Sequence, residues 1–126
     1  MNAGIPAHSF KDLRVWQKSH AMVLEVYRVS SSFPRHEIYG LTSQLRRAAV
    51  SVPANIAEGF RRRTKPDKVK FLNIAQGSLE ETRYFMILAL DLKYTTVDFA
   101  ERIDEIGRML DAYMNKILPI VSQKID

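Results

Sequence analysis

Cysteine is absent from the 126-residue sequence, so disulfide bonds and thiolate chemistry are excluded. No uninterrupted apolar run is long enough to cross a membrane, and the first ten residues lack the basic and apolar parts of a secretory signal. Low-complexity tracts and internal repeats are also missing. We therefore expect a soluble, cytoplasmic protein without a membrane partner. The length predicts one domain over residues 1–126, with flexible tails at 1–9 and 119–126.

The sequence patterns of catalytic sites are missing as well. The chain has no glycine-rich phosphate loop and no His-Glu-x-x-His pattern, and His8, His20 and His36 are scattered. We expect His20 on the apolar face of the first helix, as a packed side chain rather than a base or a ligand. Glu80 and Glu81 are adjacent, so they point in different directions on a helix and do not form an acid–base pair. The sequence predicts no enzyme activity, no metal site and no cofactor.

Apolar residues recur at intervals of three and four along four segments, which is the spacing of one face of an α-helix. No segment alternates strictly enough to predict a strand. The four stripes are Leu13, Trp16, His20, Val23 and Tyr27; Leu41, Leu45, Ala48, Val52 and Ile56; Phe71, Ala75, Ser78, Thr82, Phe85 and Ala89; and Phe99, Ile103, Ile106, Leu110, Met114 and Ile117. The pattern predicts an all-α fold, an antiparallel up-down-up-down four-helix bundle.

Capping residues and prolines predict where these helices begin and end. Proline lacks a backbone N–H, so Pro34 ends the first helix, and Pro53 is expected to kink the second without breaking it. The predicted starts are Ser9, Glu37, Thr64 and either Thr95 or Asp98, and the predicted ends of the last two helices are Lys93-Tyr94 and Leu118.

Positive charge is concentrated in one part of the sequence. The whole chain has a net charge of +5, whereas residues 46–70 alone carry +6 and residues 71–126 carry −3. A local basic cluster suggests a polyanionic partner, and a solvated surface turn is the alternative. The cations we expect to contact phosphate are Arg61, Arg62, Arg63, Lys65, Lys68 and Lys70. Such contacts would give salt-sensitive binding of RNA or DNA without strong sequence preference. Phe60 is the only aromatic residue expected nearby, so no stacking platform is predicted.

A row of polar residues borders the apolar stripe of the second helix. Helical geometry places in one narrow sector Gln44, Arg47, Ser51, Asn55 and Glu58. This row is either the solvated side of an amphipathic helix or an interhelical or intersubunit polar network. Glu58 could meet Glu81 of the third helix, and these carboxylates could pair with Arg46 and Arg47.

Three segments of the sequence resemble a known family. They are Leu13-Arg14-Val15-Trp16-Gln17-Lys18; the stretch with Phe33-Pro34, Glu37, Tyr39-Gly40-Leu41, Gln44-Leu45-Arg46-Arg47-Ala48 and Ser51-Val52-Pro53-Ala54-Asn55-Ile56-Ala57-Glu58-Gly59; and Phe71-Leu72-Asn73-Ile74-Ala75-Gln76-Gly77-Ser78-Leu79-Glu80-Glu81. Over about residues 10–118, the chain is similar to the four-helix-bundle proteins encoded in intervening sequences of bacterial 23S ribosomal RNA genes.

This resemblance implies an antiparallel four-helix bundle that assembles into a homopentamer around a central opening. A related group, the accessory variability proteins of diversity-generating retroelements, is understood to bind nucleic acid and a reverse transcriptase. The implied partners are therefore further copies of the chain, RNA or DNA, and a reverse transcriptase. A protein-interaction scaffold, or a reverse-transcriptase accessory factor with no nucleic-acid role, is the alternative function. The chain departs from the family at residues 93–96, where many members have a glycine-containing turn.

Overall fold

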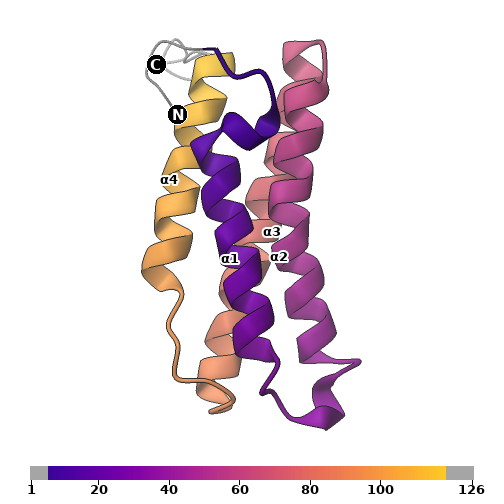
Figure 1. The fold of residues 1–126 in the computed structure, drawn as a ribbon, viewed down its shortest axis with the longest axis vertical. Coiled ribbons are helices and arrows are strands. Elements are labelled where there is room, and N and C mark those ends of the chain that lie inside the picture. Colours follow the sequence, from indigo (N-terminus) through magenta and orange to yellow (C-terminus); the bar gives the residue numbers. More distant parts are fainter. Residues whose placement is uncertain (1–5, 119–126) are drawn as a thin grey trace, which may run out of the picture.

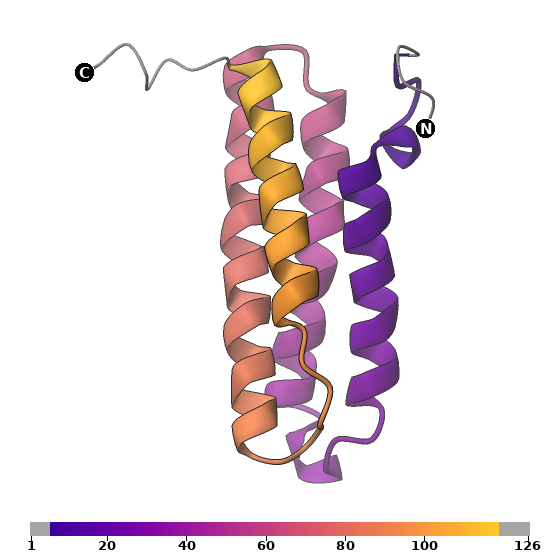
Figure 2. The same ribbon diagram turned by 90° about the vertical axis from the view of Figure 1, so that its left-hand side faces the viewer.

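Four long α-helices form a bundle in the computed structural model, which describes residues 6–118 (Figure 1). The helices are α1 (Arg14–Ser30), α2 (Leu41–Arg61), α3 (Lys65–Asp91) and α4 (Ala100–Ile117), with 3₁₀ turns η1 (Phe10–Asp12) before α1 and η2 (Arg35–Glu37) before α2. Successive helices run in opposite directions in both ribbon views (Figures 1 and 2). The described residues contain no strand, so the predicted all-α four-helix fold is confirmed. Segments 1–5 and 119–126 of the predicted tails lie outside the described residues.

The apolar stripes of α2, α3 and α4 face one another and form the core together with one face of α1. Leu45 and Ile56 of α2, Leu72 of α3, and Ile106 and Leu110 of α4 are all fully buried. Burying a side chain of this size stabilises the fold by about 1.5–3 kcal/mol. Burial of these residues is therefore what holds the helices together. Helix α2 continues through Pro53, which is itself buried, so the prediction that this proline does not break the helix is confirmed. No helix within residues 6–118 combines the length and apolarity that a membrane span requires.

Helix α1 presents a different face to the core from the one predicted. Its buried positions include Ser19, Met22 and Val26, whereas Tyr27 is 43% exposed. The prediction for His20 is wrong, because this side chain is exposed and its ring stacks on that of Trp16 at a centroid distance of 4.9 Å. The apolar pattern missed this face because it contains a serine. The hydroxyl of Ser19 donates to the carbonyl of Val15 within the same helix, so this polar side chain can be buried.

The first two helices begin later than predicted. Ser9 caps η1, in a capping box with Asp12, rather than α1 itself. Helix α2 begins at Leu41, four residues after the predicted start at Glu37. The reason is that Glu37 lies in η2, from where its Oε1 accepts a hydrogen bond of 3.1 Å from the backbone N–H of Leu41.

The ends of α3 and α4 follow the predictions more closely. Thr64 caps α3 by accepting from the N–H of Asp67. Helix α3 ends at Asp91, and Lys93 then adopts a φ of 63°. The N–H of Lys93 donates to the carbonyl of Leu90 and that of Tyr94 to Ala89, which is the Schellman arrangement that usually uses glycine.

The first turn of α4 is held by Asp98. Its Oδ1 accepts from the N–H of Ala100 at 2.8 Å. Thr95, the alternative predicted cap, accepts instead from Val97 within the preceding loop. Helix α4 ends at Ile117, one residue before the predicted end.

Candidate nucleic-acid interface

The connection between α2 and α3 is short and tightly packed. The helix α2 ends at Arg61, and the N–H of Arg62 still bonds to the carbonyl of Gly59 at 3.2 Å. A Cβ on Gly59 would lie 3.2 Å from the carbonyl oxygen of Lys68 and 3.3 Å from the side chain of Leu72. The absence of a side chain at Gly59 therefore lets the two helices approach, and the turn brings the six predicted cations to one end of the bundle (Figure 1).

Two of the six cations are engaged in contacts within the protein. Lys68 donates to the carbonyl of Phe60 at 2.8 Å and to that of Gly59 at 3.4 Å. Its ammonium group thereby provides hydrogen bonds to carbonyl groups at the C-terminal end of α2, where the helix dipole favours a positive charge. Arg62 forms an ion pair with Glu58, with 2.6 Å between Nη2 and Oε2.

The other four cations are exposed and make no side-chain hydrogen bond or ion pair with any residue in 6–118. They are Arg61, Arg63, Lys65 and Lys70. Opposing charge is sparse here, since Asp67 and Glu58 are the only acidic residues between positions 46 and 70 and Glu58 is paired. This turn therefore presents an accessible positive surface that can contact phosphate groups.

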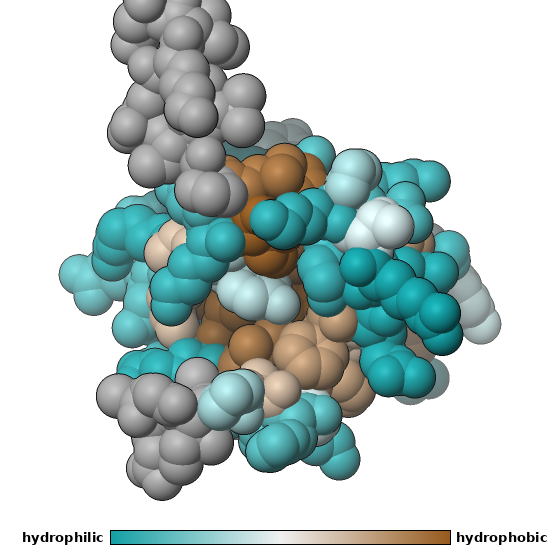
Figure 3. All heavy atoms as spheres, turned by 90° about the horizontal axis from the view of Figure 1, so that it is seen from above, coloured by the Kyte–Doolittle hydropathy of each residue, from teal (hydrophilic) through white to brown (hydrophobic). Residues whose placement is uncertain are grey.

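The end of the bundle that carries the turn also exposes apolar surface. Figure 3 looks down on this end, where hydrophilic side chains surround an apolar centre. Phe60 is half-buried and packs against the core, as expected. Phe71 was not predicted here, yet the guanidinium carbon of Arg62 lies over its ring, 4.5 Å from the centroid. Sequence spacing gave no signal for this contact, because residues 62 and 71 meet only through the tightness of the turn.

The predicted polar row on α2 divides into three parts in the structure. Ser51 Oγ lies 2.7 Å from Ser78 Oγ of α3, and Asn55 Nδ2 donates to both the carbonyl and the hydroxyl of Ser51. These three side chains therefore join α2 to α3. Gln44, Arg47 and Glu81, with Ser51, Ser78 and Phe85, line an open groove of about 310 Å³ between the same helices.

Glu58 lies apart from this groove and does not meet Glu81. Its partner is Arg62, one turn further along α2. The predicted pairing of Arg46 with Glu58 or Glu81 is also wrong, because Arg46 Nε donates to Ser30 Oγ at 2.8 Å and its guanidinium lies over the ring of Tyr27. Arg46 thus contacts the last turn of α1, whose carbonyl groups attract a positive charge.

Comparison with known proteins identifies the family of the chain. Residues 11–112 match the family of 23S rRNA-intervening sequence proteins. The chain belongs to this family. A crystal structure from Bacteroides thetaiotaomicron, described as a protein with unknown function from the S23 ribosomal protein family, is 22% identical. The similarity covers 85% of this chain and 97% of that chain, with a TM-score of 0.61, and it shows a shared fold. No curated protein matches the chain.

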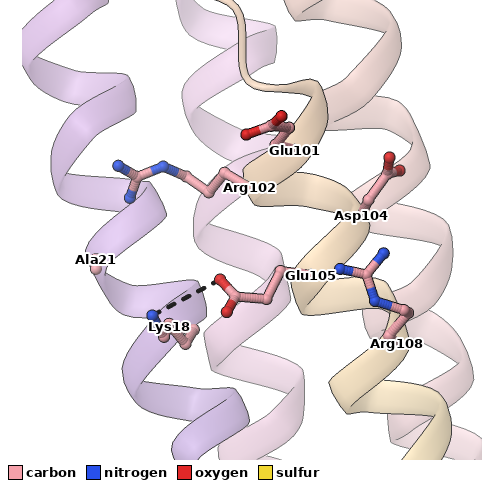
Figure 4. Close-up of a pocket in the computed structure, with 7 residues that line it drawn as sticks. All are labelled: Lys18, Ala21, Glu101, Arg102, Asp104, Glu105 and Arg108. Carbon is pink, nitrogen blue, oxygen red and sulfur yellow. Dashed lines mark ion pairs between the residues drawn. The ribbon is translucent and has the colours of Figure 1, made fainter.

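In this intervening-sequence protein, a larger groove of about 610 Å³ lies between α1 and α4 (Figure 4). Its lining carries both signs of charge, from Lys18, Glu101, Arg102, Asp104, Glu105 and Arg108. One ion pair crosses it, with 3.6 Å between Lys18 Nζ and Glu105 Oε1. Mixed charge favours no single class of ligand, so the α2–α3 turn remains the stronger candidate site.

Proposed function

We propose that this intervening-sequence protein binds RNA or DNA through the α2–α3 turn, without strong sequence preference and without catalysis. The observation that carries the proposal is the set of four exposed cations, Arg61, Arg63, Lys65 and Lys70, that have no partner among the described residues. Neutralising phosphates with such side chains releases counterions, which gives affinity that depends on salt rather than on base sequence. The proposed place of action is the cytoplasm, where a protein without cysteine loses nothing to the reducing environment.

We also propose that the protein acts as a homo-oligomer, a pentamer by resemblance to its family. Exposed apolar side chains support self-association: Leu24, Tyr27 and Val50 on α1 and α2, and Ile74, Tyr84 and Ile87 on α3. Contact between two different faces of identical chains generates a closed ring when the rotation closes. A ring would repeat the basic turn in every subunit and raise the avidity for a long polyanion. Light scattering tests this, and a monomer at tens of micromolar would contradict it.

A pair of double variants with equal charge tests the nucleic-acid proposal. Arg61→Ala with Arg63→Ala removes two cations of the turn, whereas Arg35→Ala with Arg108→Ala removes two exposed arginines elsewhere. Fluorescence anisotropy with labelled RNA and DNA at several salt concentrations measures affinity. The first variant should weaken binding for every sequence and reduce the slope of log affinity against log salt by about 1–2. The control variant should change the affinity and the salt slope much less. Absence of binding by the wild type at low salt, or equal loss in both variants, would refute the proposal.

One observation favours a protein partner as the second candidate function. Tyr39 is 95% exposed beside the exposed Ile38, and both lie in the connection between α1 and α2. This connection is at the end of the bundle opposite the α2–α3 turn (Figure 1). Exposed aromatic side chains are enriched where proteins bind one another. A scaffold or reverse-transcriptase accessory role would use this end. Loss of partner binding in Tyr39→Ser, with nucleic-acid affinity unchanged, would favour this role.

A further inference from the structure

Arg62 differs from the other cations of the turn because its guanidinium is held in place. It lies at the C-terminal cap of α2, where its N–H bonds to the carbonyl of Gly59. One edge of its guanidinium contacts the Glu58 carboxylate at 2.6 Å, and its central carbon lies 4.5 Å from the centroid of the Phe71 ring. The backbone bond fixes where the side chain starts, and the contacts with Glu58 and Phe71 orient the plane of the guanidinium.

The surface of Arg62 that remains exposed is suited to stacking. About 44% of its side chain is accessible, although Phe71 covers one side of the guanidinium and Glu58 one edge. Guanidinium planes stack on nucleobases as aromatic rings do. The ion pair also balances the charge of Arg62, so this side chain contributes less to phosphate attraction than Arg61 and Arg63, which have no such partner and flank it.

We propose that Arg62, supported by Phe71 and Glu58, is a stacking platform for an unpaired base, and that it makes the α2–α3 turn selective for single-stranded nucleic acid. This inference rests on the proposed nucleic-acid function. The free cations attract the phosphates of single strands and duplexes alike. A base inside a duplex is stacked between its neighbours and cannot reach Arg62, whereas an unpaired base can. Selectivity therefore comes from the platform, and overall affinity comes from the cations around it.

The decisive variant is Arg62→Lys, which keeps the positive charge and removes the plane. Its matched control is Arg63→Lys, the same substitution at a neighbouring arginine that is exposed and has no partner among the described residues. The probes are a labelled single-stranded RNA and a blunt RNA duplex with the same number of phosphates, each titrated by anisotropy at several salt concentrations. Circular dichroism establishes that helicity is unchanged in both variants.

Wild type should bind the single strand about tenfold more tightly than the duplex, as expected for one stacked base. Arg62→Lys should remove most of that ratio and leave duplex affinity and the salt slope unchanged, while Arg63→Lys should keep the ratio. Equal loss for both probes would make Arg62 an ordinary phosphate contact, and a ratio near one in the wild type would remove the selectivity. Either result overturns this inference and leaves the proposed function standing. If the wild type binds neither probe, the proposed function itself fails.

Discussion

Tyr94 donates a hydrogen bond of 2.8 Å from its hydroxyl to Glu37 Oε2, across 57 positions of sequence. The other oxygen of the same carboxylate accepts from the N–H of Leu41 at the start of α2. Glu37 thereby links the segment before α2 to the loop after α3 at one end of the bundle. The Leu41 N–H, and then the Tyr94 hydroxyl, hold the pKa of Glu37 below its usual value, and the bond to Glu37 raises the pKa of Tyr94.

The lowered pKa of Glu37 makes stability depend on pH. Its contribution to the free energy of unfolding is fully present above the unfolded pKa of about 4.3 and is lost as pH falls through the lower folded pKa. Glu37→Gln should therefore reduce Tm by a few degrees at pH 7, and its difference from wild type should shrink in acid. Thermal unfolding followed by circular dichroism at several pH values measures this. A Tm difference that stays constant with pH would contradict the assigned role of the carboxylate.

The hydroxyl pair between α2 and α3 should behave as one coupled unit. Ser78 is buried, and among residues 6–118 its Oγ has only one hydrogen-bond partner, the hydroxyl of Ser51. Ser51→Ala should destabilise the protein by about 1 kcal/mol, because it leaves that hydroxyl without a partner. In a double-mutant cycle with Ser78→Ala, urea unfolding should give a coupling energy of about 0.5–1 kcal/mol. Additive effects of the two substitutions would show that the bond contributes nothing to stability.

The left-handed conformation at Lys93 predicts a stabilising substitution. A residue with a Cβ pays about 1–2 kcal/mol in this region of backbone space, whereas glycine adopts it freely. Lys93→Gly should therefore raise the free energy of unfolding by about 0.5–1 kcal/mol, after allowance for the greater freedom of glycine in the unfolded chain. Lys93→Ala is the control and should give no such gain, since it keeps the Cβ. Chemical denaturation distinguishes the two, and equal effects would argue against the strained backbone.

Lys68 should matter for stability more than its neighbours in the basic turn. Lys68→Met keeps the alkyl chain but removes the bonds to the last carbonyls of α2, so it should cost about 1–2 kcal/mol. Lys65→Met, at an exposed position without a partner within the described residues, should stay within about 0.5 kcal/mol of wild type. Urea unfolding measures both variants, and an equal loss of unfolding free energy in the two would mean that the carbonyl contacts of Lys68 do not stabilise the protein.

Sequence periodicity was sufficient for the four helices and for most of the core, because long apolar stripes on α2, α3 and α4 have one arrangement that buries them together. It was insufficient for α1. There, Ser19 is buried by bonding to its own backbone, and His20 occupies an exposed position that the stripe had assigned to the core. A polar residue that hydrogen-bonds to its own helix backbone can be buried, and a search for apolar residues does not detect it.

The cationic α2–α3 turn could be located from sequence, but sequence could not show which of its cations contact other protein groups. Charge counting treats Arg62 and Lys68 like Arg61 and Arg63, because it does not contain the contacts with Glu58, Phe71 and the carbonyl of Phe60. Those contacts depend on the close approach of α2 and α3 at Gly59. Which cations are free is therefore a property of the packed turn and not of the composition.

The stack of His20 on Trp16 has a practical consequence. Trp16 is the single tryptophan of the chain, and the ring of Phe10 in η1 meets it edge-on at 5.0 Å. All indole fluorescence of the protein therefore originates where the N-terminal turn rests on α1, at the same end as the basic turn. Trp16 is therefore an intrinsic fluorescent probe of that end of the bundle, and it does not report on the opposite end.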